Sequence, residues 1–234
     1  VFKLDTVSWL PHLDYLKQIF IDLIQPERIV LRISRTVADS PSCPEQLKVG
    51  CVIYGPVLDG PVIFQENGLK FEAEPIIGQK TGFFLDQRDN RARVGELARR
   101  KDVLNVFSYT GGFSLYAASN GAKSVTSLDL SRPALDAALN NFKLNISNSE
   151  ISRTPHILMC DDAFEALRKL AGDGKVYDIV ILDPPSFAKK LVDVPGAIKA
   201  YGKLVKLGLG VLKKNGVLVS ASCSARVSAT DFFE

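Results

Sequence analysis

The chain has 234 residues, a formal net charge of +3, and 46% apolar against 24% charged residues. These values are ordinary for a globular protein, and so mild a positive charge permits a nucleic-acid partner without requiring one. No apolar run approaches the roughly 18 residues of a membrane-spanning helix, and the amino end lacks the basic-then-apolar pattern of a signal peptide. Four cysteines without a CxxC pattern and only two histidines argue against a zinc site or a disulfide framework. We therefore expect a protein of the reducing cytoplasm, with one main domain and a smaller accessory one.

Residues 1–77 predict a small α+β domain. The segment "SWLPHLDYLKQIFIDLI", residues 8–24, suits an amphipathic helix. The runs "RIVLRIS", "KVGCVIYG", "PVIFQ" and "LKFEAE" suit antiparallel strands. Between the last two, "ENG" predicts a tight hairpin turn, because Asn-Gly tolerates positive φ.

Residues 78–234 predict a Rossmann-like α/β domain. Five apolar runs, "VLNVF", "SVTSLDL", "HILMC", "YDIVIL" and "GVLVSAS", alternate with helical patterns. This alternation favours a doubly wound, mainly parallel sheet, and the near-continuous apolar runs indicate strands covered on both faces. Gly121 is placed to end the helix after the first run, and Ser131 to cap the helix after the second.

Candidate chemistry follows each of the five predicted strands. In an open parallel sheet, ligands bind beyond the carboxyl ends of the strands. The residues found there are, in chain order, "SYTGGF", Asp129, Asp161 with Asp162, "DPPSF" and Cys223. A single glycine turn or acid is explained by chain reversal or by a helix cap. Their occurrence at every strand end favours a ligand site.

The glycine turn favours S-adenosylmethionine over a dinucleotide. "SYTGGFSL" lacks the third glycine of the G-x-G-x-x-G pattern that lets pyrophosphate approach the backbone. A turn at Gly111 and Gly112 without that phosphate cradle suits a nucleoside with an amino-acid tail. Asp129, about 18 residues further on, is placed to accept hydrogen bonds from two ribose hydroxyls.

The "DPPSF" segment favours binding of a flat base. Pro184 and Pro185 fix the backbone and remove two donors, so Asp183 is followed by a rigid loop whose carbonyls can face a base. Phe187 offers a stacking surface for the same base. The simpler explanation is a prolyl loop that only leads the chain away from the sheet.

Five segments together resemble a known family. They are "ENGLKFEAEPIIGQKTGFFLDQRDNR", "VLNVFSYTGGFSLYAASNGAKSVTSLDLS", "DDAF", "YDIVILDPPSFAK" and "LVSASCS". Through them, residues 66–224 resemble the class I S-adenosylmethionine-dependent RNA methyltransferases, specifically the large-subunit (23S) ribosomal RNA cytosine-5 type. The resemblance implies ribosomal RNA as the substrate. It also implies a preceding PUA-type domain and two further strands after the fifth, so we expect the sheet of this sequence to be incomplete.

The resemblance also assigns residues to the cofactor. Within "GQKTGFFLDQR" it implies contacts on the methionine side, and the turn after the first strand is expected to bind the cofactor. Asp129 is expected to hold the ribose and Asp162 to flank the adenine. The complete expected set is Lys80, Thr81, Gly82, Phe107, Ser108, Tyr109, Thr110, Gly111, Gly112, Asp129, Leu130, Asp162, Ala163 and Asp183.

In the strand order expected for this family, Asp183 and Cys223 are neighbours over the target base. Carbon 5 of cytosine is a poor nucleophile, and a thiolate that adds to carbon 6 activates it. We therefore expect Cys223 to be the catalytic nucleophile and Asp183 to bind the polar edge of the base. A nearby sulfonium or Arg226 would favour the thiolate. The other cysteines, Cys43, Cys51 and Cys160, are expected to be small core residues.

A basic surface is expected to contact the RNA around this pocket. It comprises Lys80, Arg88, Arg91, Lys189 and Lys190. A solvated helix face is the alternative explanation of the charge excess between residues 79 and 101. Together with the base-binding loop, the expected substrate contacts are Pro184, Pro185, Phe187, Arg88 and Lys189.

Two other functions fit parts of the sequence. A guanine or adenine base-nitrogen RNA methyltransferase would use "DPPS" to orient an exocyclic amine and would need no cysteine. A noncatalytic RNA-binding module with the same fold is the second alternative. Cys223 between two serines favours the cytosine-5 reaction, because the related guanine-methylating branch has asparagine at this place.

Overall fold

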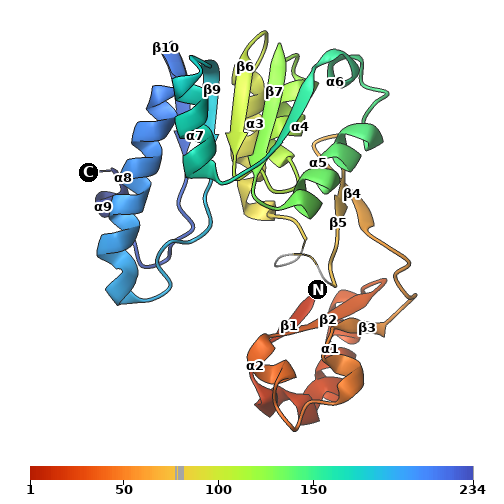
Figure 1. Ribbon diagram of the computed structural model, residues 1–234. Coiled ribbons are helices and arrows are strands. Elements are labelled where there is room, and N and C mark those ends of the chain that lie inside the picture. Colours follow the sequence, from red (N-terminus) through yellow and green to blue (C-terminus); the bar gives the residue numbers. More distant parts are fainter. Residues whose placement is uncertain (77, 79–81, 234) are drawn as a thin grey trace. The chain divides into compact units, whose positions relative to one another are not determined.

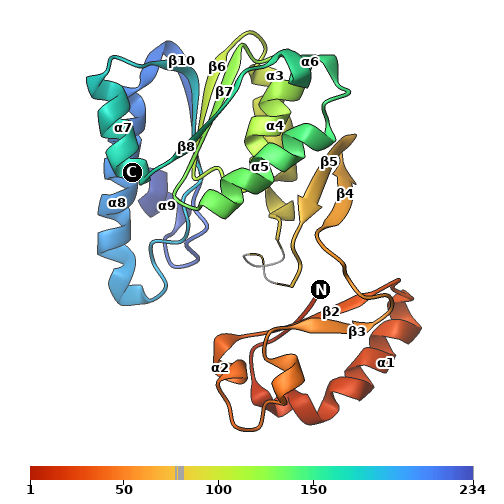
Figure 2. The same cartoon turned by 45° about the vertical axis from the view of Figure 1, so that its right-hand side comes forward.

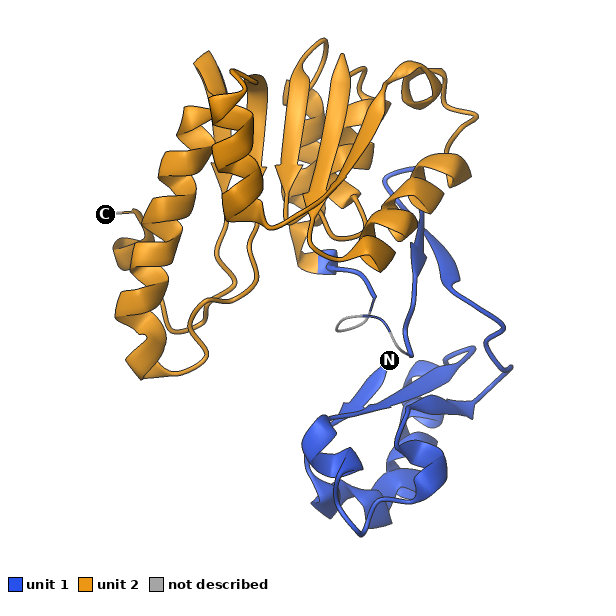
Figure 3. Cartoon of the chain, in the orientation of Figure 1, with its two compact units in different colours: residues 1–85 blue, residues 86–234 orange. Residues whose placement is uncertain are grey.

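The computed structural model describes residues 1–76, 78 and 82–233. The chain divides into two compact units, residues 1–85 and residues 86–234 (Figure 3). The boundary between the two units, after residue 85, lies eight residues beyond the predicted boundary after residue 77. None of the described helices is both long and apolar enough to cross a membrane.

The first unit contains a small mixed sheet and a separate hairpin (Figure 1). β1 pairs parallel to β2, whereas only antiparallel strands were predicted, and β2 pairs antiparallel to β3. The predicted helix begins as a 3-10 turn, Val7–His12, which contains Pro11, a residue that lacks an N–H donor. The remaining elements of this unit are β1 (Phe2–Leu4), α1 (Leu13–Ile24), β2 (Ile29–Ile33), α2 (Arg35–Ala38), the 3-10 turn Glu45–Leu47, β3 (Cys51–Tyr54), β4 (Val62–Glu66) and β5 (Leu69–Ala73).

The hairpin of β4 and β5 confirms the predicted Asn-Gly turn. Asn67 and Gly68 adopt φ values of 50° and 81°, and Glu66 pairs with Leu69 directly across the turn. Two-residue turns of this kind match the twist of the flanking strands.

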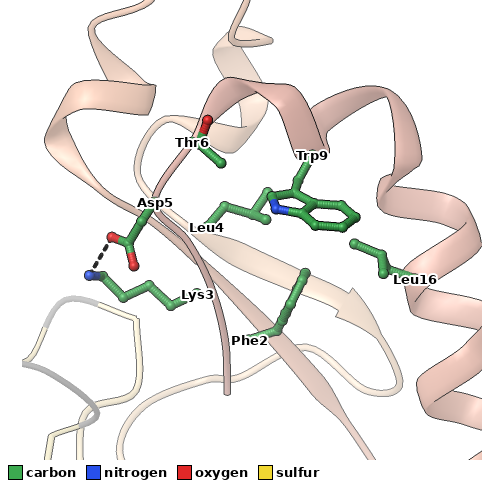
Figure 4. Close-up of a pocket in the computed structure, with 7 residues that line it drawn as sticks. All are labelled: Phe2, Lys3, Leu4, Asp5, Thr6, Trp9 and Leu16. Carbon is green, nitrogen blue, oxygen red and sulfur yellow. Dashed lines mark hydrogen bonds and ion pairs between the residues drawn. The ribbon is translucent and has the colours of Figure 1, made fainter.

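A pocket of about 300 Å³ lies between β1, the first 3-10 turn and α1 (Figure 4). Lys3 and Asp5 form an ion pair of 2.6 Å within its lining, so their charges are satisfied by each other. The rest of the lining is mainly apolar, and we assign the pocket no chemistry. Its lining residues are Phe2, Lys3, Leu4, Asp5, Thr6, Trp9 and Leu16.

The second unit is a five-stranded sheet in the order β10-β9-β6-β7-β8, with all neighbours parallel. Helices α3, α4 and α5 cover one face, and α7 and α8 cover the other (Figure 2). This architecture confirms the predicted doubly wound α/β class. Its elements are α3 (Arg88–Leu97), β6 (Asp102–Val106), α4 (Gly112–Ser119), β7 (Ser124–Asp129), α5 (Arg132–Leu144), α6 (Ser149–Arg153), β8 (His156–Cys160), α7 (Ala163–Gly172), β9 (Tyr177–Leu182), α8 (Val194–Gly210), β10 (Leu212–Ser220) and α9 (Ala229–Phe233), with 3-10 turns at Leu85–Gln87 and Leu191–Asp193.

The central strands are buried on both faces. Leu104 and Val106 of β6 and Leu182 of β9 have no exposed surface, and they pack in one cluster with side chains of α7 and α8. The chain passes from β6 to β7 and β8 on one side and then returns to β9 on the other side of β6. In sheets of this kind, ligands bind at the carboxyl ends of the strands where the order reverses, which are here β6 and β9.

The local helix signals agree with the predictions. The Ser131 hydroxyl accepts a hydrogen bond of 3.3 Å from the backbone of Ala134 and caps α5. Gly121, with φ 79°, follows α4 in the left-handed conformation that glycine adopts without a steric penalty.

The amino ends of the strands carry charges that neutralise one another. The Lys213 ammonium of β10 donates hydrogen bonds of 2.9 Å to Asp102 of β6 and to Asp178 of β9. These hydrogen bonds raise the pKa of Lys213. Burial alone would raise the pKa of Asp102 and of Asp178, but hydrogen bonds, including those from Lys213, outweigh it and the pKa of both carboxyls falls. This edge of the sheet is therefore a structural ion-pair cluster that joins three strands.

A line of polar side chains runs through the buried part of the second unit. The Asn105 amide donates to Ser114 at 2.9 Å, the Ser114 and Ser127 hydroxyls lie 2.7 Å apart, and Ser127 lies 2.8 Å from Nε2 of His156. The imidazole also stacks on the Phe142 ring with centroids 3.7 Å apart. Burial lowers the pKa of His156 to about 4.

We expect His156 to make the stability of the protein depend on pH below neutrality. An unfolded histidine has a pKa of about 6.5, so unfolding takes up a proton between about pH 6.5 and 4. The neutral imidazole makes its full contribution to the free energy of unfolding above about pH 6.5. That contribution is lost as the pH falls from about 6.5 to 4, by at most roughly 3 kcal/mol. Urea unfolding at pH 7.5, 6 and 5 should show that the free energy of unfolding falls more steeply with decreasing pH in the wild type than in His156→Gln. Equal pH dependence of the two proteins would contradict this expectation.

Candidate functional site

The turn after β6 has an unusual backbone. Phe107, Tyr109 and Gly111 adopt φ values of 59°, 48° and 74°. For residues other than glycine this conformation costs on the order of 1–3 kcal/mol, and it clusters at ligand sites. The turn must therefore be held in place by its surroundings.

Helices α5 and α3 hold the turn closely. The buried Asn141 amide of α5 donates a 2.8 Å hydrogen bond to the carbonyl of Thr110. A side chain at Gly111 would place its Cβ 2.8 Å from the Cβ of Ala138, and one at Gly112 would place it 2.9 Å from Cδ of Arg91. A side chain at Gly111 would thus clash with α5, and one at Gly112 would require the Arg91 side chain to move.

Ser108 gives the turn an unused polar group. Its hydroxyl is buried, with 6% of the residue exposed, and it has no hydrogen-bond partner among the residues that the structure describes. Buried hydroxyls normally have a partner, so an unpaired one beside a strained turn fits a site that a polar ligand completes.

Asp129 stands at the carboxyl end of β7 and is held by the backbone on both sides. Its Oδ2 accepts a 2.8 Å hydrogen bond from the backbone of Tyr109, and its Oδ1 accepts one of 2.8 Å from Ser131. It does not cap α5, because Ser131 does. Each carboxylate oxygen keeps further acceptor capacity, so the fixed carboxylate suits a diol such as a ribose. Leu130, 71% exposed, lies next to it in the chain.

Asp162 has a structural role that Asp129 lacks. Its Oδ1 accepts hydrogen bonds of 2.9 and 3.1 Å from the backbone of Phe164 and Glu165, so it caps α7. Ala163, the first residue of that helix, is buried. The adenine contacts of Asp162 and Ala163 stay a prediction.

The cysteines differ in burial from the prediction. Cys43 is buried, as expected, whereas Cys51 is half-buried. The expectation that Cys160 is a core residue is wrong: the residue is exposed, and its thiol donates to the carbonyl of Leu130 at 3.5 Å. It ends β8, which lies at one edge of the five-stranded sheet.

Asp183 follows β9 and is oriented by a residue that the sequence did not single out. The Gln87 side-chain amide donates a 3.2 Å hydrogen bond to Oδ2 of Asp183, and the Asn90 side-chain amide donates one of 2.7 Å to Oε1 of Gln87. Gln87 lies in "GQKTGFFLDQR", the segment expected on the methionine side of the cofactor, but neither Gln87 nor Asn90 was predicted to contact Asp183. Asp183 itself is half-buried.

Cys223 follows β10 and lies beside the Asp183 loop. The residue is exposed, so it is not a core cysteine, and its thiol donates to the carbonyl of Pro184 at 3.7 Å. β9 and β10 are neighbours, which brings the two loops together. Pro184 is buried and Pro185 is exposed.

Phe187 is only partly available to a ligand. The residue is half-buried, and its ring packs against Tyr201 of α8 and Phe164 of α7, with centroids 4.9 and 6.4 Å apart. Base stacking by Phe187 stays a prediction.

The predicted basic surface needs one correction. Arg91 is only 3% exposed and packs against Gly112, so it cannot contact phosphate groups. Its charge made it look like a surface residue in the sequence. Arg88 lies 3.1 Å from Asp89 with 59% of its side chain exposed, and Lys189 and Lys190 are exposed.

Three of the predicted cofactor residues belong to the segment of residues 80–82, of which the structure describes only Gly82. Lys80 and Thr81 lie outside the described residues. Gly82 adopts φ 86°, and a Cβ there would lie 2.5 Å from the backbone nitrogen of Glu74, so this position requires glycine.

Comparisons with known proteins identify relatives of the chain. It is 50% identical over all 234 residues to a "Ribosomal RNA large subunit methyltransferase" of Deinococcus radiodurans, of which it covers 56%. It is 42% identical over 173 residues to "Ribosomal RNA large subunit methyltransferase I" of Vibrio vulnificus, an alignment that covers 74% of this chain and 43% of that protein. The chain thus spans about half the length of the curated relatives it matches.

A solved structure and a family model agree with these relatives. The crystal structure of SMU.776 complexed with SAH superimposes with a TM-score of 0.80 at 27% identity, covering 99% of this chain and 57% of that one. Residues 52–230 match the family model described as S-adenosylmethionine-dependent methyltransferase. The strained turn with its unpaired Ser108 hydroxyl and the fixed carboxylate of Asp129 fit the cofactor of that family. The chain belongs to the S-adenosylmethionine-dependent methyltransferase family.

Proposed function

We propose that the chain methylates carbon 5 of a cytosine in ribosomal RNA, with Cys223 as a covalent nucleophile. The observation that carries this proposal is the exposed Cys223 thiol, 3.7 Å from the carbonyl of Pro184 and next to the loop of Asp183. Two relatives named as large-subunit ribosomal RNA methyltransferases support the choice of substrate.

The carboxyl edge of the sheet divides into two halves in this proposal. The turn after β6 and Asp129 after β7 hold S-adenosylmethionine, which supplies an electrophilic methyl group when bound. The loops after β9 and β10 carry Asp183 and Cys223 and receive the base. The Asp183 carboxylate accepts a hydrogen bond from the exocyclic amine of cytosine, the pairing that carboxylates make with this base.

The thiol activates carbon 5 from the neighbouring atom. The Cys223 thiolate forms a bond to carbon 6, and the electron pair of the 5,6 double bond moves to carbon 5, which becomes nucleophilic. After carbon 5 has gained the methyl group, a base takes its proton and the sulfur–carbon 6 bond breaks. These two steps restore the double bond and release the thiolate. A cytosine inside a duplex must first be flipped out, because the thiol needs the face of the ring.

The covalent step can be tested with fluorinated RNA. Ribosomal RNA transcribed with 5-fluorocytidine is incubated with the protein and S-adenosylmethionine. Fluorine cannot leave as a cation, so the adduct should persist as a gel-stable protein–RNA species that maps to Cys223 by peptide mass analysis. Nucleoside mass analysis of ordinary RNA should find 5-methylcytidine. A methyl group found only on a base nitrogen would overturn the proposal and favour the base-nitrogen alternative.

We expect Lys189 and Lys190 to contact the RNA backbone. Both side chains are exposed, and Oδ2 of Asp193 accepts hydrogen bonds of 3.2 and 2.9 Å from their backbone nitrogens, which fixes this segment beside the substrate loop. Each phosphate contact contributes about one unit to the slope of log affinity against log salt. The double variant Lys189→Gln with Lys190→Gln should therefore bind RNA more weakly and with a shallower salt slope.

Lys143 and Lys175 provide the matched control for that surface. Both are exposed. Lys143 lies in the last turn of α5, and Lys175 precedes β9, at the opposite end of that strand from the Asp183 loop. Their double glutamine variant removes the same charge and should leave the salt slope almost unchanged. Equal slopes for the two double variants would show that Lys189 and Lys190 are only a solvated surface.

A further inference from the structure

We infer that Ser224 is a positioning residue for Cys223, and that Tyr201 and Ser222 position Cys223 together with it through hydrogen bonds. The inference rests on the proposed function and deepens it. It starts from the burial of Ser224, which is only 4% exposed although it directly follows the exposed Cys223. The buried Ser224 hydroxyl can fix the backbone beside Cys223, while the Cys223 thiol stays exposed.

The Ser224 hydroxyl joins the loop after β10 to the loop after β9. It accepts hydrogen bonds from the backbone nitrogens of Phe187 and Ala188, at 3.1 and 3.3 Å. It also lies 3.1 Å from the Ser186 hydroxyl and 2.8 Å from the Tyr201 hydroxyl. One side chain therefore contacts three consecutive residues of the Asp183 loop and helix α8.

The number of available protons assigns a donor to each of these hydrogen bonds. Ser222 donates to the Tyr201 hydroxyl at 2.9 Å, and Ser186 donates to the carbonyl of Ala188 at 3.1 Å. Each hydroxyl has only one proton. The arrangement that gives each of these contacts a proton has Tyr201 donating to Ser224 and Ser224 donating to Ser186. The result is a continuous chain of donors from Ser222 to the Ala188 carbonyl, in which each hydroxyl also accepts and each bond polarises the next.

This chain of hydrogen bonds explains why two serines flank the cysteine. Ser222 and Ser224 both contact the Tyr201 hydroxyl. Tyr201 is 5% exposed, and its ring packs against those of Phe187 and Phe232 with centroids 4.9 and 5.2 Å apart. The backbone of Cys223 is thereby fixed on both sides, while its thiol stays exposed beside Pro184. The position of the thiol is thus set by α8 and the Asp183 loop as well as by its own strand.

Covalent addition needs such control of position. The sulfur must approach carbon 6 to about 3–3.5 Å along a defined direction, and a misplacement of about 1 Å can cost around 100-fold in rate. In the proposed function, cofactor binding depends on the turn after β6 and on Asp129 after β7, whereas the hydrogen bonds of Ser222, Ser224 and Tyr201, the serine network, join the loops after β9 and β10 to α8. Loss of the network should therefore affect the chemical step and leave both binding steps intact.

The test compares Ser224→Ala and Tyr201→Phe with the wild type. Tyr201→Phe keeps the packed ring and removes only the hydroxyl, so it serves if Ser224→Ala fails to fold. We expect kcat to fall about 10- to 100-fold, the rate of adduct formation with 5-fluorocytidine RNA to fall in parallel, and the KM for RNA and the Kd for S-adenosylmethionine to change less than twofold. The control is Ser152→Ala, which removes an exposed hydroxyl of α6 that donates to the carbonyl of Ser149 at 3.0 Å and should leave all four values unchanged.

The outcomes separate this inference from the proposed function. A wild-type protein that forms no adduct would refute the covalent cysteine mechanism itself. A wild type that forms the adduct, with both variants equally fast, would refute only the positioning role. Parallel losses in kcat and in cofactor affinity would also refute it, because they would show a general structural effect.

Discussion

Replacing Cys223 by alanine is expected to lower methyl transfer to RNA by several orders of magnitude. The variant removes the group that adds to carbon 6, and carbon 5 of cytosine has little nucleophilicity without that addition. The neighbouring hydroxyls of Ser222 and Ser224 cannot replace it, because they are far weaker nucleophiles and are occupied in the hydrogen-bond chain with Tyr201. Single-turnover transfer of a labelled methyl group would measure the effect, and filter binding and calorimetry should show unchanged affinities for RNA and cofactor.

Cys160→Ala is the matched control for this experiment. Cys160 is the other exposed cysteine and also stands at the carboxyl edge of the sheet, but at the end of β8. Its removal should change the rate less than twofold. Full cytosine methylation by Cys223→Ala would contradict the mechanism, and so would an adduct that maps to Cys160.

The fold of the second unit was predictable because its strands are buried on both faces. Such strands read as apolar runs, and the alternation with helical patterns leaves few topologies. Helix α3 was expected only as the solvated helix face that could explain the charge excess of residues 79–101, because its sequence is mostly polar and its buried side includes Arg91, a residue type that normally lies on the surface. The parallel β1 was also missed, because three residues give too short a pattern to detect.

The candidate site was predictable as a set of strand ends but not in the role of each residue. Asp129 and Asp162 look alike in the sequence, since each acid follows a strand and precedes a helix. The structure separates them, because Asp162 caps α7 whereas Ser131 caps α5 and leaves Asp129 to fix the glycine turn. Which of two neighbouring polar groups caps a helix depends on the backbone conformation at the helix start, which residue order alone does not determine.

The hydrogen bonds of Ser224 could not be predicted from the sequence because its partners are distant in the chain. Ser224 contacts Tyr201, 23 positions away in the chain, and Phe187, 37 positions away. These contacts depend on the pairing of β9 with β10 and on where α8 crosses them. The sequence does contain the signal, since two serines flank a cysteine, but their partners become visible only in three dimensions.

Asp129→Ala is expected to weaken binding of S-adenosylmethionine by about 10- to 100-fold. Removing a charged acceptor that holds two hydroxyls costs on the order of 1.5–3 kcal/mol, which corresponds to that range of affinity. The carboxylate also accepts hydrogen bonds from the backbone of Tyr109 and Ser131. Its loss should therefore loosen the left-handed turn as well, and the larger end of the range is expected.

Two further variants make the Asp129 experiment decisive. Asp129→Asn keeps one acceptor oxygen and loses the charge, so its affinity should lie between those of the wild type and the alanine variant. Asp136→Ala removes an exposed carboxylate of α5 that is paired with Arg132 at 2.9 Å, and it should bind the cofactor as the wild type does. Calorimetric titration measures all four proteins under one set of conditions. If Asp129→Ala binds as tightly as Asp136→Ala, then the carboxylate of Asp129 supports only the turn and another group must hold the ribose.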